Sequence, residues 1–263
     1  MTDRKFIVTE GRTGGELVAM AQDWAKMLKA EYMPRCHNRS LDAVMEERGL
    51  EAVLIATRTG PKLYSRLGGD FAYHPGMAVL RLQQLKRGER DHFVNALALE
   101  PGMRVLDGTL GLASDAAIAS YIVGEQGSVI GTEASPLLHF VVSRGLASYR
   151  AEDPDLTAAL RRIKAVQCSS EEYLRQCLAT NTGFDVIYFD PMFRRPVAGS
   201  AAMDSLRPVA YEKPLSDTTV ELALQLAPRV VIKERNEYIL REYGCQEFVG
   251  GKYSKVKFGI IRG

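Results

Sequence analysis

Apolar runs typical of buried strands alternate with helical stretches through most of the chain, and this alternation constrains the fold more than any other feature. The strand candidates lie at residues 104–107, 128–132, 165–167, 185–189 and 229–233. Such alternation is typical of a parallel sheet with helices on both faces. Two further strand candidates flank Gly250 and Gly251 without an intervening helix, which predicts an antiparallel hairpin. We therefore expect a Rossmann-like, doubly wound α/β fold.

The beginning of the chain follows a different pattern. Short strand candidates at residues 6–9, 52–56 and 62–66 accompany two helices, the first expected to end near Ala30. The second helix candidate ends at Gly49, a residue suited to the left-handed conformation that closes helices. These elements predict a small α/β unit of its own.

A helical stretch over residues 77–99 connects the two patterns. Its basic residues are expected to face solvent, and they are Arg81, Lys86, Arg87 and Arg90. A chain of 263 residues can form one large core and a small additional one. We predict a small N-terminal α/β domain over residues 1–72 and a larger domain over residues 73–263.

Composition limits where the protein works and what it binds. The four cysteines form no CxxC pair and the four histidines show no metal-ligand spacing, so we expect reduced thiols and no metal site. The N-terminus has no long apolar segment, and no run approaches the ~18 apolar residues that a membrane span needs. A net charge of +2 is small for a protein that coats nucleic acid. We expect a cytoplasmic protein without a membrane partner.

Asp107 ends a strand candidate and opens a glycine-containing turn that runs to Asp115. Ligands of doubly wound sheets bind beyond the carboxyl ends of the strands. In this turn Gly108 and Gly111 permit a ligand to approach the backbone closely. The helix expected to begin near Ser114 adds unpaired N–H groups at its positive end. We therefore predict a ligand site at this turn.

Glu133 ends the next strand candidate, at a spacing where a carboxylate can bind both ribose hydroxyls of a nucleoside. A nicotinamide enzyme usually has Gly-x-Gly-x-x-Gly at the preceding turn, so that the pyrophosphate can approach the helix. Here Ala113 takes the place of a glycine. Asp115 would repel a pyrophosphate but suits the cationic sulfonium of S-adenosylmethionine. The residues favour S-adenosylmethionine over NAD.

Residues 190–193, Asp-Pro-Met-Phe, directly follow the apolar run at residues 185–189. The Asp190 carboxylate and the Pro191 carbonyl can accept the hydrogens of an exocyclic amine, while the Phe193 ring can stack on a base. Holding the amine in this way directs its lone pair at the methyl group, and orientation is a strong lever on rate. We predict Asp190, Pro191 and Phe193 as catalytic residues. The predicted substrate-binding residues are Met192, Phe193, Arg194 and Arg195.

These motifs resemble those of the bacterial small-subunit ribosomal RNA guanine-N2 methyltransferases and their relatives in Gram-positive species. That family carries Asp-x-Thr-x-Gly-Leu-Gly-Arg-Asp at the cofactor turn, Glu-Arg-x-Pro after the second strand, a Ser-Ser pair after the third and Asp-Pro-Met-Phe at the target strand. The corresponding segments here are residues 107–115, 133–136, 168–170 and 190–193. The similarity begins near Gly69 and continues to the C-terminus, and the strand that includes Lys233 also resembles the family.

The resemblance implies a class I methyltransferase fold with a mostly parallel, seven-stranded sheet and S-adenosylmethionine as the cofactor. The cofactor-binding residues that it implies, together with the turn described above, are Asp107, Gly108, Thr109, Gly111, Ser114, Asp115, Glu133, Ala134, Ser169, Ser170 and Asp190. Met192 also matches the family, whereas most amino-methylating enzymes have a second proline there. The chain departs from the family where Ala113 and Ser114 replace Gly-Arg and where Ala134 replaces Arg.

We therefore expect an S-adenosylmethionine-dependent methyltransferase that acts on the exocyclic amine of a nucleobase. The resemblance points to guanine N2 in small-subunit ribosomal RNA, with that RNA or the ribosomal subunit as the partner. The residues alone do not separate guanine from adenine, since both carry an exocyclic amine. Other hypotheses are a methyltransferase for adenine N6, DNA or a small amine, a nicotinamide-dependent oxidoreductase, and a non-catalytic RNA-binding factor.

Overall fold

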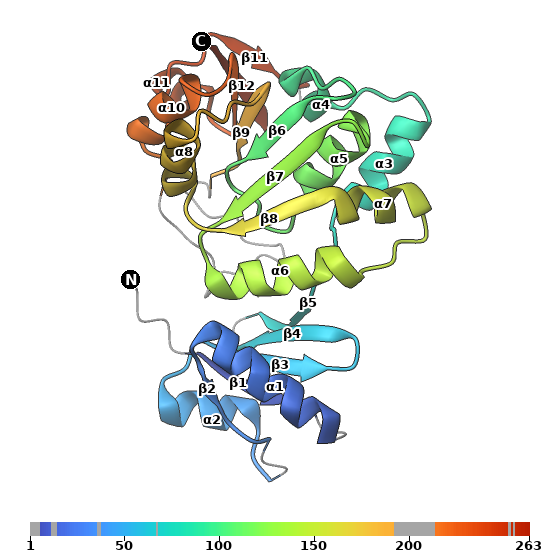
Figure 1. The fold of residues 1–263 in the computed structure, drawn as a ribbon, viewed down its shortest axis with the longest axis vertical. Helices are drawn as coiled ribbons and strands as arrows, with labels where there is room; N and C mark the ends of the chain where they lie inside the picture. The colour runs from blue at the N-terminus through green and yellow to red at the C-terminus, as the bar shows by residue number, and fades with distance from the viewer. Residues whose placement is uncertain are drawn as a thin grey trace. The chain divides into compact units, whose positions relative to one another are not determined.

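The computed structural model of the chain describes residues 6–11, 15–35, 38–66, 68–191, 214–251, 254 and 256–263. They form two compact units (Figure 1). The first contains the N-terminal segment that ends at His74, together with Ser135–Ser148 from the middle of the sequence. The second contains Pro75–Ala134 and the described residues that follow Ser148. We keep the domain boundary at residues 72 and 73 as a prediction.

The first unit is built on a five-stranded sheet with the order β2-β1-β3-β4-β5. Strand β1 pairs in parallel with β2 and β3, whereas β4 is antiparallel to β3 and β5. The strands are β1 (Phe6–Glu10), β2 (Glu31–Tyr32), β3 (Ala52–Thr57), β4 (Gly60–Ser65) and β5 (Gly69–Ala72). The three strands expected from the sequence are therefore confirmed, and β2 and β5 are added to them.

Three helices pack on this sheet: α1 (Gly15–Leu28), α2 (Leu41–Arg48) and α6 (Pro136–Ser148). As expected, Gly49 ends α2, in a left-handed conformation with φ 60°. Sequence analysis did not anticipate α6 in this unit. Its Phe140 ring meets Trp24 of α1 edge-on, with 5.3 Å between ring centroids. A Cβ atom on Gly145 would lie 2.5 Å from Tyr73 Cβ, so α6 packs closely against the end of the N-terminal segment.

The second unit contains a seven-stranded sheet with the order β11-β12-β10-β9-β6-β7-β8. All pairs among β6 to β10 are parallel, and only β12 is antiparallel to its neighbours β10 and β11. The strands are β6 (Arg104–Asp107), β7 (Ser128–Glu133), β8 (Ile163–Gln167), β9 (Val186–Phe189), β10 (Arg229–Glu234), β11 (Glu247–Val249) and β12 (Lys257–Arg262). This confirms the predicted parallel sheet and C-terminal hairpin.

Helices cover both faces of this sheet (Figure 1). Ile187 and Phe189 belong to an apolar core that also includes Leu174 of α8 (Ser170–Ala179) and Val220 of α10 (Asp217–Leu224). Tyr188 points to the opposite face, where its ring meets Phe93 of α4 (His92–Leu97) edge-on. The remaining helices of this unit are α3 (Ala78–Lys86), α5 (Ser114–Val123), α7 (Pro154–Arg162) and α11 (Glu237–Glu242).

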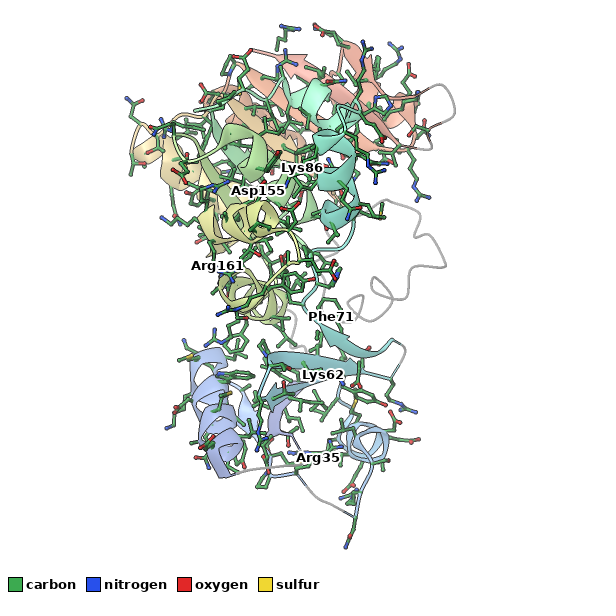
Figure 2. All side chains as sticks on the ribbon, turned by 90° about the vertical axis from the view of Figure 1, so that its right-hand side faces the viewer. Arg35, Lys62, Phe71, Lys86, Asp155 and Arg161 are labelled. Carbon is green, nitrogen blue, oxygen red and sulfur yellow. The ribbon has the colours of Figure 1, made fainter. Side chains whose placement is uncertain are left out.

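The helix expected over residues 77–99 is in fact two, α3 and α4. Asp91 separates them, because its carboxylate accepts hydrogen bonds from the N–H groups of Phe93 and Val94 and so caps α4. The expectation that Arg81 faces solvent was wrong: its side chain is only 15% exposed and ion-paired. Lys86 does lie at the surface, where it pairs with Asp155 of α7 at 2.7 Å (Figure 2).

Candidate functional site

The strand order of the second unit reverses between β6 and β9, because β7 and β8 lie beyond β6 while β10 and β12 lie beyond β9. Asp107 of β6 aligns with Tyr188 of β9, and Phe189 aligns with Ile232 of β10. Asp190 and Lys233, the next residues of the two strands, therefore emerge side by side. Ligands of open α/β sheets bind at such a reversal point, beyond the carboxyl ends of the strands.

The turn after β6 is held from both neighbouring strands. The Gly108 N–H donates to the Tyr188 carbonyl at 2.8 Å, on the β9 side. On the β7 side, the Thr132 hydroxyl donates to the Gly108 carbonyl at 3.0 Å and the Leu110 N–H donates to the Thr132 carbonyl at 2.9 Å. These bonds fix the backbone of the turn, so the surface that it presents to a ligand is preorganised.

The turn continues into α5 through two residues with positive φ, Gly111 at 48° and Ala113 at 59°. Ala113 stands where the resembling family has glycine, and it keeps the left-handed conformation that glycine adopts more easily, at a cost of about 1–2 kcal/mol. The next residue, Ser114, begins α5, and its hydroxyl donates to the Pro75 carbonyl at 2.8 Å. Ala113 therefore adopts the left-handed conformation without a glycine at this position.

Burial favours the protonated form of the Asp107 carboxyl. Burial, with smaller contributions from the nearby Asp115 and Asp190, raises the pKa of this carboxyl to about 8, against the opposing effects of the Thr109 N–H and Lys233. Its Oδ1 accepts the Thr109 N–H at 3.0 Å. Asp107 thus stabilises the turn mainly through this hydrogen bond.

Replacement of Asp107 with asparagine is expected to stabilise the unliganded protein increasingly as pH rises from about 4 to about 8. The unfolded chain releases the Asp107 proton near its ordinary pKa of 3.8, while the folded protein keeps it to about 8. The folded state thus binds more protons in this window, and the wild-type free energy of unfolding falls as pH rises, by at most about 1.4 kcal/mol per pH unit. Asparagine removes this dependence. Urea unfolding at both ends of the window measures it, and a stability difference independent of pH would contradict the assignment.

Asp190 is fixed at the end of β9 by two contacts. Its N–H donates to the Thr109 hydroxyl at 2.6 Å, which ties the strand end to the turn after β6. Its carboxylate Oδ2 accepts a hydrogen bond from Lys233 Nζ at 2.6 Å. Burial raises the pKa of Asp190 to about 6, with Lys233 acting against the rise and Asp115 adding to it. Asp190 is therefore mostly a carboxylate at neutral pH.

A chain of charged groups extends from Asp190 across the face covered by α4 and α5. Lys233 Nζ also reaches Asp115 Oδ2, at 3.2 Å, and the Tyr188 hydroxyl donates to the same oxygen at 2.8 Å. Arg81 Nη1 binds Asp115 Oδ1 at 2.5 Å, and Arg81 Nε binds Asp91 at 2.7 Å. Although burial opposes ionisation, Lys233 and Arg81 keep the pKa of Asp115 below its usual range.

The contacts of Asp115 bear on its predicted role in cofactor binding. Its two carboxylate oxygens already accept hydrogen bonds from Arg81, Tyr188 and Lys233. Its side chain therefore connects α3, α5, β9 and β10, and its backbone lies in the first turn of α5. Contact between Asp115 and the cofactor stays a prediction.

The other predicted cofactor residues lie at the ends of β7 and β8. Glu133 is buried as the last residue of β7 and aligns with Gln167 of β8. Ala134 follows it directly. Ser169 caps α8, since its hydroxyl accepts the Glu172 N–H at 3.3 Å. Ser170 lies near the turn after β6, because a Cβ atom on Gly108 would be 3.3 Å from Ser170 Cβ.

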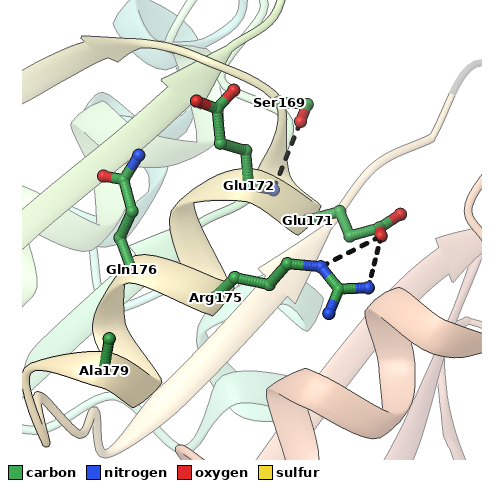
Figure 3. A pocket seen from close by; sticks show the side chains of 6 residues that line it. All are labelled: Ser169, Glu171, Glu172, Arg175, Gln176 and Ala179. Atoms are coloured by element: carbon green, nitrogen blue, oxygen red, sulfur yellow. Dashed lines mark hydrogen bonds and ion pairs between the residues drawn. The ribbon is translucent and has the colours of Figure 1, made fainter.

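A surface hollow on α8 lies next to one of these residues (Figure 3). It is lined by Ser169, Glu171, Glu172, Arg175, Gln176 and Ala179. Arg175 and Glu171 pair across it at 2.8 Å. The hollow includes none of Asp107, Glu133 and Asp190, so we do not assign the cofactor to it.

Sequence analysis missed the parts played by Lys233, Tyr188 and Arg81. Strand β10, which contains Lys233, resembles the family, but this resemblance did not predict a role for the lysine. A lysine at the end of an otherwise apolar strand was the available signal, because a charged group there needs a partner. The four predicted substrate residues Met192, Phe193, Arg194 and Arg195 lie outside the described residues, whereas Pro191 is described and buried.

The charges at this edge fit a cationic cofactor. Among the described residues, the network holds the carboxyl groups of Asp91, Asp107, Asp115 and Asp190 against the cations Arg81 and Lys233. Even with Asp107 protonated, carboxylates outnumber the cations. A sulfonium is therefore favoured here and a pyrophosphate is disfavoured. The glycine-containing turn permits close approach to the backbone, and the buried Glu133 adds a carboxylate, which together suit the nucleoside and amino-acid parts of S-adenosylmethionine.

The described residues also bear on metal binding and on membrane spans. In the part of the chain that the structure describes, no cluster of three or more His, Cys, Asp or Glu side chains is placed to hold a metal ion. Among the described helices, none combines the length and the apolar character that crossing a membrane requires.

Comparison with known proteins gives a family match over most of the chain. Residues 50–253 match the family described as "Putative SAM-dependent methyltransferase". A Bacillus subtilis (strain 168) relative, "Uncharacterized protein YpiP", is 33% identical over 229 residues, which cover 86% of this chain and 87% of the relative. "Ribosomal RNA small subunit methyltransferase J" of Acinetobacter baylyi is 28% identical over 167 residues, 58% of this chain and 60% of that protein. The match to the latter thus spans less than two thirds of its length.

A solved structure has the same fold. The crystal structure of the SAM-dependent methyltransferase NGO1261 from Neisseria gonorrhoeae superposes with a TM-score of 0.62 and covers 97% of this chain and 95% of its own. The two sequences are 16% identical, so the likeness concerns the fold alone. It confirms the predicted class I methyltransferase architecture.

Proposed function

This chain belongs to the family of S-adenosylmethionine-dependent methyltransferases, and from that premise we propose that it methylates the exocyclic amine of a nucleobase, guanine N2 of small-subunit ribosomal RNA. The cofactor is S-adenosyl-L-methionine, which supplies an electrophilic methyl group when bound. The observation that carries the proposal is a partly buried aspartate at the reversal point, Asp190, held beside the turn after β6 by Thr109 and Lys233.

We assign the cofactor to the carboxyl ends of β6, β7 and β8. The turn with Gly108 and Gly111 lets the cofactor approach the backbone closely, and Glu133 offers a carboxylate for the ribose hydroxyls. The remaining residues of the proposed cofactor site are Asp107, Thr109, Ser114, Asp115, Ala134, Ser169, Ser170 and Asp190. Asp190 lies between this set and the target side, because it directly follows β9, the strand next to β6.

On the target side, the chain's own residues hold and orient the amine. The Asp190 carboxylate and the Pro191 carbonyl accept the two amine hydrogens, which fixes the nitrogen and favours a pyramidal geometry with a directed lone pair. We assign Phe193 to stacking on the base, Met192 to substrate binding, and Arg194 and Arg195 to phosphate binding. Stacking worth ~1–3 kcal/mol per base offsets part of the cost of extruding a paired base.

The choice of RNA rests on a relative rather than on the described residues. The Acinetobacter baylyi protein is named a ribosomal RNA small subunit methyltransferase, and the Asp-Pro-Met-Phe run at residues 190–193 resembles the motif of that family. We accordingly propose ribosomal RNA or the small ribosomal subunit as the partner, and the cytoplasm as the location.

The test is to incubate the protein with methyl-labelled S-adenosylmethionine and small-subunit RNA, free and in assembled particles, from a strain that lacks this protein. The RNA is then digested to nucleosides. We expect the label in N2-methylguanosine. Label in N6-methyladenosine or another nucleoside would overturn the base assignment, and cofactor binding without any labelled RNA would overturn RNA as the acceptor.

A further inference from the structure

We propose that Lys233 is the positioning residue of this site: its ammonium holds Asp190 by one carboxylate oxygen and keeps it charged, so that the other oxygen meets the target amine. The inference rests on the proposed function for the identity of that amine. The contact itself is a 2.6 Å hydrogen bond from Lys233 Nζ to Asp190 Oδ2. Because it uses Oδ2, we assign Oδ1 to the amine.

Strand register brings the two residues of this pair side by side. Phe189 and Ile232 are partners in the parallel β9–β10 ladder, and Asp190 and Lys233 each come one residue later. Lys233 follows Ile232, whose side chain is in the core beneath α8 and α10, so the lysine points to the opposite face. There it is covered by α4 and α5, and its side chain is only 21% exposed. The ammonium is therefore delivered to Asp190 by strand register.

A second carboxylate keeps the ammonium in place. Asp115 Oδ2 lies 3.2 Å from Lys233 Nζ, and Asp115 is itself held by the Tyr188 hydroxyl and by Arg81. Arg81 in turn binds Asp91, the residue that caps α4. Lys233 thus bridges an anchored carboxylate and the carboxylate that we assign to the amine. Its position is set by the register of β10 and by the carboxylate that α5 supplies.

The charges around Asp190 make this cation necessary. The acidic groups that face it are Asp107 from β6, Asp115 from α5 and Glu234 from β10, together with the phenol of Tyr188 from β9. Lys233 contacts Asp190 directly, whereas Arg81 meets Asp115. Burial and the acidic neighbours raise the pKa of Asp190, and Lys233 limits the rise to about 6. Without Lys233 the carboxyl would hold its proton at neutral pH and lose an acceptor for the amine.

The test compares Lys233→Met, Lys233→Arg and, as a control, Tyr188→Phe. In the wild type, activity should fall as pH decreases through the pKa of Asp190, near 6. In Lys233→Met the pKa of Asp190 rises, so the acid limb of the pH–activity profile, where activity falls with decreasing pH, should move above neutral pH. We expect kcat to be reduced at least about 10-fold at pH 7 and to recover partly at higher pH. Lys233→Arg, which keeps the cation, should return the limb toward the wild-type position.

Tyr188→Phe removes the other donor to Asp115 Oδ2 but leaves the Lys233–Asp190 contact, so its acid limb should stay at the wild-type position. An acid limb that coincides in Lys233→Met and wild type would overturn the proposal. An acid limb displaced as far in Tyr188→Phe as in Lys233→Met would also overturn it, because general loosening of the network would then explain both shifts.

A measurement without substrate separates this inference from the proposed function. The Asp190 carboxyl carbon can be followed by 13C NMR titration of the free protein, identified by its absence in Asp190→Asn. A pKa that is higher in Lys233→Met than in wild type supports the role of Lys233, even if the assay with RNA finds no methylated guanine. An unchanged pKa overturns the role of Lys233 and leaves the methyltransferase assignment intact.

Discussion

Asp190→Asn is expected to lower the rate of methyl transfer at least about 100-fold while leaving the protein folded. Asparagine has the same size, but its uncharged amide places a donor where the carboxylate has an acceptor, and it weakens the 2.6 Å contact with Lys233. Misplacement of a reacting group by ~1 Å can cost about this factor. Single-turnover rates with labelled cofactor measure the effect, because they separate chemistry from binding and product release.

The matched control for this variant is Asp155→Asn, the same chemical change at a surface aspartate of α7, which pairs with Lys86. Its rate should equal that of the wild type. Binding of S-adenosylhomocysteine and the circular dichroism spectrum of Asp190→Asn verify that the site and the fold persist. An undiminished single-turnover rate in Asp190→Asn would remove Asp190 from the mechanism.

Gly108→Ala is expected to destabilise the protein by about 1–3 kcal/mol and to weaken S-adenosylhomocysteine binding at least about 10-fold. The new methyl group would lie 2.6 Å from Phe189 Cδ1 and 3.3 Å from Ser170 Cβ. Phe189 is fully buried and directly precedes Asp190, so its ring can move only by disturbing the core beneath the site. Thermal unfolding and calorimetric titration measure the two effects.

Gly15→Ala is the control, since a Cβ atom there meets nothing within 4 Å. It should leave stability and cofactor binding almost unchanged. If Gly108→Ala bound the cofactor product as tightly as Gly15→Ala, then the turn after β6 would not be the cofactor site, whatever happened to stability.

Local signals explain the features that the sequence predicted correctly. The parallel strands were visible as short apolar runs between helical stretches, and the hairpin as two runs around Gly250 and Gly251. Gly49 could be assigned to the end of α2 because one residue in a left-handed conformation suffices to close a helix. In each case the pattern depends on residues that are neighbours in the chain.

The features that were missed depend on partners far apart in the sequence. Arg81 looked like a surface residue of a helix, yet its partner Asp115 lies 34 positions away. Lys233 meets Asp190 and Asp115 from separations of 43 and 118 positions. Sequence periodicity predicts which face of its own helix or strand a charged side chain occupies. It does not predict which charged residue of another element packs against that face. That requires the strand order and the helix packing.

Helix α6 has a consequence for how the protein is made. It belongs to the first unit, where Phe140 packs on Trp24, but the ribosome produces it only after β6, α5 and β7. At roughly 5–20 residues per second, the N-terminal segment waits on the order of ten seconds after His74 before Ser148 is added. During that time the surface that α6 will cover is exposed on the nascent chain. The first unit therefore acquires α6 only after about half of the chain has been made, and until then its apolar surface is open to chaperones and to aggregation.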